Sequence, residues 1–102
     1  MILNAKITSA EIFIEDHGLL TFCLYVDTSA GWSTGIGMFD LKGCANIDSL
    51  LRDILDLVGV TRWSDLKGKY IRIDDNNRWN STVTMIGNLM EDNWIDLRSY
   101  FL

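Results

Sequence analysis

The sequence contains no proline, only two cysteines and a single histidine in 102 residues. A domain that depends on disulfides carries more cysteines, and zinc sites need paired ligands at short spacings such as C-x-x-C. Cys23 and Cys44 are therefore expected to be free thiols in a reducing cytoplasm. A three-histidine zinc centre is excluded because His17 has no second histidine to join it, and we expect no metal site.

Long apolar runs and an excess of basic residues are also missing. No stretch reaches the roughly 18 consecutive apolar residues of a membrane span, and "MILNAKITSAEIF" lacks the pattern of an export signal, so we expect a cytoplasmic protein without membrane contact. Nine Lys and Arg stand against 14 Asp and Glu, which gives a net charge of −5. This charge repels a phosphate backbone, so a protein with a basic surface is a better match than nucleic acid.

Apolar residues make up 48% of the chain and are spread along its whole length, which indicates a folded domain rather than a disordered chain. There is no low-complexity run or internal repeat to mark a linker. A chain of 102 residues can bury one core, so residues 1–102 are expected to form a single domain.

Alternating apolar residues predict strands at 7–14 and 19–26, joined by the hairpin loop Glu-Asp-His-Gly, in which Gly18 can adopt a positive φ. A turn "DTSAG" leads to a third strand at 32–39. "KYIRID" and "TVTMIGNLM" predict a second hairpin around the polar loop "DNNRWNS", residues 75–81. The tail "EDNWIDLRSYFL" is apolar enough to pack back on the sheet.

Helical spacing of apolar residues predicts a helix over 47–58, with Asn46 as N-cap and Gly59 just beyond its C-terminus. The expected buried side chains of this helix are those of Leu51, Ile54 and Leu55. Its opposite side carries Asp and Arg residues.

"TRWSDLKG" predicts one further helical turn, capped by Thr61 and ended by Gly68. Together these elements predict an α+β fold: an antiparallel sheet of about five strands with one main helix packed on one face.

His17 could act as a general base beside Asp16 or Glu15, with Ser9 or Cys23 as nucleophile. Neighbouring residues at a hairpin tip point into solvent, however, and nothing there excludes water or supplies an oxyanion hole. We interpret His17 as an ordinary turn residue, and we predict that the protein is not an enzyme.

The glycine-rich stretch "AGWSTGIGMFD" lacks the third glycine of G-x-G-x-x-G and the Gly-Lys-Ser/Thr of a P-loop. It also enters a strand rather than opening a helix, so sheet pairing would use its backbone N–H groups. The stretch predicts a close approach of another backbone or a bend in the sheet, and we expect no cofactor.

Acidic residues cluster at the predicted hairpin tips, beside two tryptophans. "DDNNRWN" does not match a calcium loop, because Arg78 interrupts the ligand positions. Aromatic residues amid charge are typical of protein interfaces. We therefore predict a partner-binding surface made of Glu15, Asp16, Asp74, Asp75, Trp79, Glu91, Asp92 and Trp94.

An alternative surface is the stretch "RWSDLKGKYIRI", residues 62–72, which could hold a single nucleic-acid strand by charge and stacking. It contains four basic and two aromatic residues: Arg62, Lys67, Lys69, Arg72, Trp63 and Tyr70. The net negative charge of the chain works against this hypothesis.

The strings "SAEIFIEDHGLLTFCLYVD", "TGIGMFDL", "GVTRWSDLKGKYIRI" and "IGNLMEDNWIDL", in this order, cover nearly the whole chain. In these motifs the sequence resembles a group of small bacteriophage and prophage proteins without an assigned activity. The resemblance implies no catalytic residues. It implies a phage gene context, in which accessory proteins of this size, anti-CRISPR proteins among them, act by occupying a surface of a host protein.

The sequence thus predicts a small acidic phage-derived protein that binds and inhibits or modulates a host protein, such as an anti-CRISPR protein blocking a nucleic-acid-binding effector. In such a protein, carboxylates can stand in for phosphates. The alternative is a small nucleic-acid-binding accessory protein that uses residues 62–72. An unpaired edge strand and the apolar tail are also compatible with a homodimer.

Overall fold

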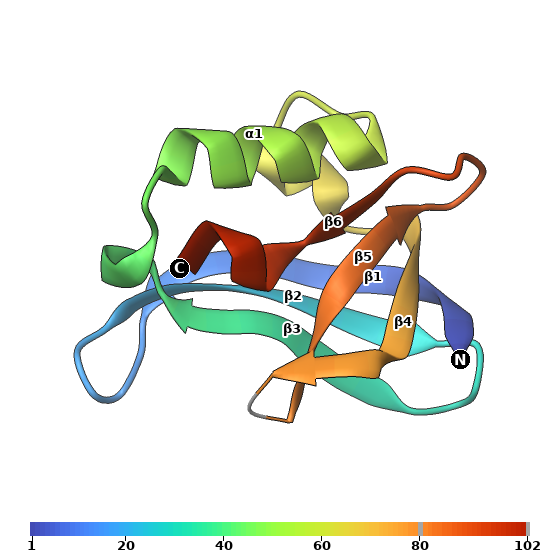
Figure 1. The fold of residues 1–102 in the computed structure, drawn as a ribbon, viewed down its shortest axis with the longest axis horizontal. Helices are drawn as coiled ribbons and strands as arrows, with labels where there is room; N and C mark the ends of the chain where they lie inside the picture. The colour runs from blue at the N-terminus through green and yellow to red at the C-terminus, as the bar shows by residue number, and fades with distance from the viewer. Residues whose placement is uncertain (80, 102) are drawn as a thin grey trace.

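Figure 1 shows the computed structural model of the chain, which describes residues 1–79 and 81–101. These residues form a six-stranded sheet of β1 (Ile2–Ile14), β2 (Leu20–Thr28), β3 (Ser33–Asp40), β4 (Tyr70–Trp79), β5 (Thr82–Asn88) and β6 (Trp94–Asp96). They also form the helix α1 (Ile47–Val58) and the 3-10 helices η1 (Leu41–Gly43), η2 (Trp63–Leu66) and η3 (Leu97–Phe101). The predicted α+β fold is confirmed, with one strand more than the five expected.

The strand order is β3-β2-β1-β4-β5-β6, and all neighbouring strands are antiparallel. The additional strand is β6, which the tail contributes at the edge beside β5. The prediction that the tail packs on the sheet is therefore confirmed for its described residues, while Leu102 lies outside them.

Glycines with positive φ close the first two hairpins, and the sequence predicts this conformation for Gly18. Gly18 has φ 82° in the β1–β2 loop, and Gly31 has φ 89° in the β2–β3 turn. A side chain at either position would be strained, because L-residues rarely adopt this conformation.

The ends of α1 are as predicted. Asn46 Oδ1 accepts a hydrogen bond from the Ser49 N–H at 3.0 Å, and Gly59 ends the helix with φ 88°. The predicted buried face is wrong for two of its three residues. Leu50, Ile54 and Leu57 are fully buried, whereas Leu51 and Leu55 are only partly buried.

The physical reason for this difference is the position of η3. The Tyr100 hydroxyl of η3 donates a hydrogen bond to Asp53, so η3 covers the flank of α1 that carries Asp53. Burial raises the pKa of Tyr100 to about 12. Leu51 lies about 100° around the helix from Leu50, on the flank away from Asp53, where coverage is thinner.

The predicted polar loop at 75–81 is mostly strand. β4 continues to Trp79, which pairs with Thr82, and the register is irregular between Asp74 and Arg78. The Arg78 guanidinium donates hydrogen bonds to the carbonyl oxygens of Asp75 and Ser81, which supports the irregular backbone. Asn80 of the predicted loop lies outside the described residues.

The predicted turn at 61–68 is a 3-10 helix, and its cap differs from the prediction. η2 starts after Arg62, without a side-chain capping hydrogen bond, rather than after Thr61. Gly68 follows it with φ 88°, as predicted.

The glycine-rich strand β3 contains both a bend and a close approach, as its sequence indicates. Its register with β2 shifts between Thr21 and Cys23, and Gly37 and Met38 both have positive φ. A Cβ at Gly37 would lie 2.8 Å from the Phe22 ring. Only glycine fits this position, because Phe22 is a fully buried core residue.

In Figure 1, α1 and η3 cover one face of the sheet, and the core lies between that face and the two helices. The sheet curls so that β5 comes close to β3, although these two strands are not neighbours in the strand order. Phe39 of β3 and Trp79 of β4 pack together where the curl closes, with ring centroids 5.0 Å apart. Within the described part of the chain, every helix is too short or too polar to cross a membrane.

Candidate functional site

The predicted acidic residues lie at three separate places. Glu15 and Asp16 are at the tip of the β1–β2 hairpin, whereas Asp74 and Asp75 are in β4 beside the N-terminus. Glu91 and Asp92 lie in the loop between β5 and β6. Figure 1 shows the β1–β2 hairpin tip and the N-terminus at opposite ends of the long axis, so the structure does not bring these carboxylates together.

Asp74 and Asp75 are partly buried and make internal contacts. The Met1 amine lies 2.9 Å from Asp75 Oδ1 and 3.7 Å from Asp74 Oδ1. Asp74 Oδ1 also accepts a hydrogen bond from the Asn76 N–H at 3.0 Å. These two carboxylates therefore hold local structure at the irregular part of β4.

The predicted anchor Trp94 packs inside the protein's own structure. Its ring lies on Gly87, where a Cβ would be 2.6 Å from the indole. The Arg72 guanidinium lies over the ring, 5.0 Å from its centroid, and donates hydrogen bonds to the carbonyl oxygens of Asn88 and Glu91. Trp94 and Arg72 thus fix the β5–β6 connection.

Trp79 is placed in a similar way. Its ring packs on Phe39, and the Arg98 guanidinium lies 5.1 Å from its centroid. Both predicted tryptophan anchors are partly buried and contact arginine. Whether either also touches a partner stays a prediction.

The basic residues of the stretch 62–72 have different roles in the structure. Arg72 is used internally, whereas Arg62, Lys67 and Lys69 are exposed. Lys67 and Lys69 border a polar hollow of about 480 Å³. Asp65 lines the same hollow, so its basic character is diluted.

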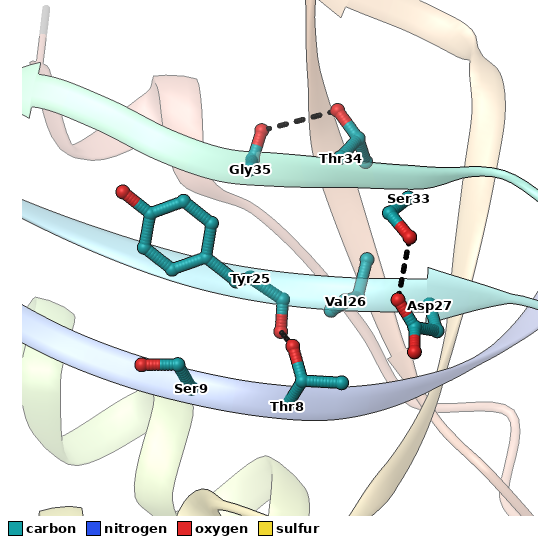
Figure 2. Close-up of a pocket in the computed structure, with 8 residues that line it drawn as sticks. All are labelled: Thr8, Ser9, Tyr25, Val26, Asp27, Ser33, Thr34 and Gly35. Atoms are coloured by element: carbon teal, nitrogen blue, oxygen red, sulfur yellow. Dashed lines mark hydrogen bonds between the residues drawn. The ribbon is translucent and has the colours of Figure 1, made fainter.

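Figure 2 shows a hollow over β1, β2 and β3. It measures about 470 Å³ and is lined by Thr8, Ser9, Tyr25, Val26, Asp27, Ser33, Thr34 and Gly35. The Ser33 hydroxyl donates to Asp27, and the Thr8 hydroxyl donates to the Tyr25 carbonyl oxygen at 3.1 Å. These two contacts hold the Thr8 and Ser33 hydroxyls within the hollow.

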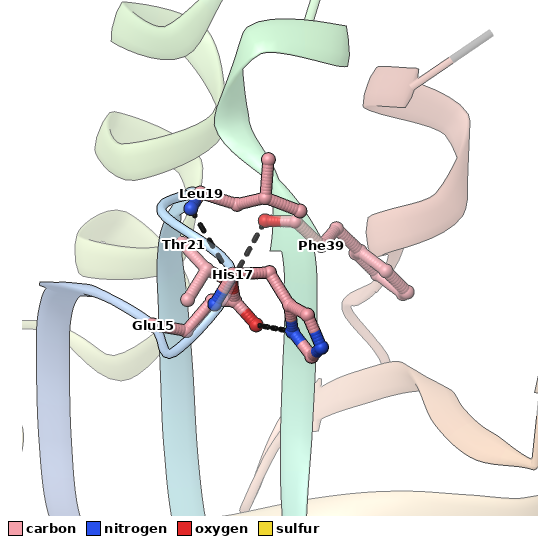
Figure 3. Close-up of polar contacts among 5 residues, drawn as sticks. All are labelled: Glu15, His17, Leu19, Thr21 and Phe39. Carbon is pink, nitrogen blue, oxygen red and sulfur yellow. Dashed lines mark hydrogen bonds and ion pairs between the residues drawn. The ribbon is translucent and has the colours of Figure 1, made fainter.

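His17 lies at the hairpin tip, as predicted, and Glu15 holds it there (Figure 3). Glu15 Oε1 accepts from the backbone N–H groups of His17 and Leu19 at 2.6 and 3.1 Å, and Oε2 lies 2.8 Å from His17 Nδ1. The hydrogen bond to Glu15 raises the pKa of His17, and the same bond lowers the pKa of Glu15.

One of the two nucleophiles considered beside His17 is poorly suited to that role. Cys23 is fully buried, and burial raises the pKa of its thiol, which disfavours the reactive thiolate. At the base of the hairpin, the Thr21 hydroxyl donates to the Phe39 carbonyl oxygen at 2.8 Å and joins β2 to β3 (Figure 3). Among the described residues, no three His, Cys, Asp or Glu side chains gather in a way that could hold a metal ion.

An exposed apolar surface that was not predicted lies at the β1–β2 hairpin. We call it the hairpin patch, and it consists of Ile12, Ile14, Leu19, Leu20 and Ile47, whose exposed fractions range from 41% to 69%. A hollow of about 400 Å³ lies beside it, lined by Leu19, Leu20, Leu41 and Ile47 together with Gly18, Asp40 and Lys42. The patch combines residues of β1, β2 and the first turn of α1.

Acidic side chains flank the hairpin patch at its tip, where Asp16 is exposed and Glu15 is partly exposed beside Ile14. Asp40 and Lys42 line the hollow beside the patch, and Glu11 is exposed on the opposite face of β1. The other face of the hairpin also has an apolar hollow, of about 270 Å³, whose lining includes Phe13, Tyr25 and Met38 beside Glu15 and Asp16. Glu15 and Asp16 are therefore the two predicted residues that adjoin exposed apolar surface on both sides.

One feature of the sequence indicates this patch, although the alternation of apolar residues by itself does not. Leu3, Ala5 and Ile7 are at odd positions and Ile12 and Ile14 at even ones, and only the register shift between Ile7 and Ser9 places both sets on the same face of the sheet. The two predicted strands, however, carry apolar residues right up to the hairpin loop. This apolar surface is longer than one 12-residue helix can cover. An apolar hairpin end of this kind either meets another element or stays exposed.

The fold and this surface together define a small α+β protein with a six-stranded antiparallel sheet and an apolar, acid-rimmed hairpin. No protein-family model, curated protein or solved structure matches the chain.

Proposed function

We propose that this chain is a protein-binding module that uses the hairpin patch and its acidic rim to occupy an apolar and basic surface of another protein. The observation that carries the proposal is the exposure of five large apolar side chains at the β1–β2 hairpin and the start of α1, with Glu15 and Asp16 beside Ile14 at the hairpin tip. Contiguous exposed apolar surface with a polar rim is typical of interaction sites. The net charge of −5 favours association with a basic partner.

The finer features of the proposal follow from the sequence resemblance. We propose that binding inhibits or modulates a host protein in the cytoplasm of a phage-infected cell, with a nucleic-acid-binding effector as the target in an anti-CRISPR role. The acidic rim supports such a target, because carboxylates can replace phosphates at a basic groove. No catalytic role is part of this proposal.

The test is capture of a partner from host lysate by the tagged chain, compared among variants. Ile14→Ser and Leu19→Ser together should reduce capture of a specific partner at least about tenfold, because they remove apolar contacts at the patch. The matched control is Met90→Ser, at a residue that is 86% exposed and outside the patch. Equal capture by the patch variant and the control would exclude the hairpin patch as the binding surface.

Two further variants test the role of the acidic rim and the alternative of nucleic-acid binding. Asp16→Lys should slow association more than it speeds dissociation, because rim charges act mainly on association. A gel shift on DNA and RNA tests the alternative. Binding that weakens steeply with salt and is lost in Lys67→Ala/Lys69→Ala would replace the protein-binding proposal by nucleic-acid binding at that hollow.

A further inference from the structure

Strand β1 is paired along only part of one of its edges. It pairs with β2 from Ala5 to Ile14, but with β4 only from Ile2 to Lys6. Ile7 extends the second contact by hydrogen bonds with Gly68 and Lys69. Beyond the register shift after Ile7, the side of β1 that faces away from β2 has no partner strand in the described structure.

The register shows which backbone groups this free edge presents. The Glu15 N–H donates to the carbonyl oxygen of Leu19, just before β2 begins, so Glu15 directs its N–H toward the β2 side of the hairpin. Because hydrogen-bonded positions alternate along an antiparallel ladder, Glu11 and Phe13 also direct their backbone groups to β2. Ala10, Ile12 and Ile14 therefore direct their N–H and C=O groups outward, and among the described residues these groups have no backbone hydrogen bond to another element.

The side chains on this edge make it suitable for pairing. Ile12 and Ile14 are 42% and 69% exposed, and they lie on the same face of the sheet as their neighbours Phe22 and Leu20 on β2. Glu11 is exposed on the other face. The segment contains no proline and no lysine, which are the residues that commonly protect an edge strand.

The charges on the edge favour a different protein over a second copy of this chain. Antiparallel self-pairing centred on Ile12 would place Glu11 opposite Phe13 and bring the two Glu11 carboxylates to diagonal positions on one face. It would also bring together two hairpin tips that each carry Glu15 and Asp16, in molecules of net charge −5. A strand with basic side chains on that face would instead meet Glu11 with opposite charge.

We propose that the free edge of β1 from Ala10 to Ile14 binds an extended segment of a partner protein by antiparallel strand addition. The segment has apolar residues at alternate positions, which pack beside Ile12 and Ile14, and Lys or Arg between them, facing Glu11. This inference rests on the proposed protein-binding function and identifies the kind of segment that the hairpin recognises. Main-chain hydrogen bonds supply affinity in this mode, and alternate side chains supply specificity.

The probe is a synthetic peptide of about ten alternating valine and lysine residues, added to the isotope-labelled protein and followed by NMR. The expected result is chemical-shift change and slowed hydrogen exchange at the amides of Ala10, Ile12 and Ile14. A peptide N-methylated at the valines, whose N–H groups would face β1, should bind at least about tenfold more weakly. The matched peptide N-methylated at the lysines should bind as the parent does.

A variant of the protein gives a second, independent measurement. Ile12→Pro removes an outward N–H but no hydrogen bond to β2, so it should fold and weaken the peptide at least about tenfold. Ile12→Val is the control, because it keeps both the N–H and a β-branched side chain. The N-methylated peptides leave the protein unchanged, so they decide the matter should Ile12→Pro fail to fold.

Four results would overturn strand addition. The first two are peptide binding at other amides and equal binding of both N-methylated peptides. Either result is compatible with patch-dependent capture of a partner from lysate, so the proposed function would stand. Edge amides that become protected without peptide as the protein concentration rises would assign the edge to a second copy. Loss of both peptide binding and patch-dependent capture would reject strand addition and the proposed function together.

Discussion

At the scale of single residues, three of the four tryptophans lie under arginine side chains. Arg78, Arg98 and Arg72 stand 5.8, 5.1 and 5.0 Å from the ring centroids of Trp32, Trp79 and Trp94. A guanidinium within about 6 Å of an indole is attracted to the ring face and shields it from water. These tryptophans can therefore sit near the surface while contributing to internal structure.

His17 and Glu15 give a prediction about pH. Their hydrogen bond raises the pKa of His17 above 6.5 and lowers that of Glu15 below 4.5. The His17 contribution to stability is present below pH 6.5 and is lost as the pH rises through its folded-state pKa. The Glu15 contribution is present above pH 4.5 and is lost as the pH falls through its own, so the pair stabilises the loop most between these values.

An NMR titration of the imidazole checks this prediction. Glu15→Gln should return the pKa of His17 toward 6.5, because the gain comes mainly from the Glu15 carboxylate. Asp16→Asn serves as control and should change the pKa of His17 less, because Glu15 still accepts the hydrogen bond. An unshifted His17 in the wild-type chain would show that the contact does not persist in solution.

At the scale of elements, two substitutions in α1 test which face of the helix is buried. Leu50→Ala should lower the free energy of unfolding by about 2–5 kcal/mol, because it removes a fully buried side chain and leaves a cavity. Leu51→Ala changes the same residue type in the same helix and should cost only roughly 1 kcal/mol. Urea unfolding measures both, and a larger loss for Leu51→Ala would place the buried stripe on the flank away from η3.

The β1–β2 hairpin illustrates how one element can serve two purposes. Along β2, Phe22, Leu24 and Val26 are buried in the core. On the same face, Ile12 opposite Phe22 and Ile14 opposite Leu20 are exposed at the end of β1. The hairpin is thus anchored by β2 and can present the end of β1 to a partner.

At the scale of the whole molecule, Trp79 closes the curled sheet by contacting Phe39 of β3 and Arg98 of η3. Trp79→Ala should therefore lower the free energy of unfolding by about 1–3 kcal/mol. Met90→Ala, at a residue with 86% exposure, is the control and should change it by less than about 0.5 kcal/mol. If Trp79→Ala left the stability unchanged but reduced partner capture, the ring would be a binding anchor, as the sequence predicted.

Local features of the sequence determined most of the secondary structure. Alternation located the hairpin strands, Asn46 and Gly59 bounded α1, and Gly18 and Gly31 marked turns, because each depends on residues that are neighbours in the chain. Local sequence features did not predict the continuation of β4 to Trp79. Its polar residues favour a loop locally, and pairing with β5 makes them a strand.

The candidate site depended on tertiary structure, because coverage and pairing involve residues that are distant in the chain. The register shift after Ile7 places Ile7 and Ile12 on the same face of β1, yet Ile12 is 42% exposed and Ile7 is fully buried, because the segment between η2 and β4 hydrogen-bonds to Ile7 and does not pair with Ile12. The sequence by itself determined that an apolar hairpin with an acidic tip would form. Only the tertiary structure decided that this hairpin would project beyond the core, with the edge of β1 left open for a partner.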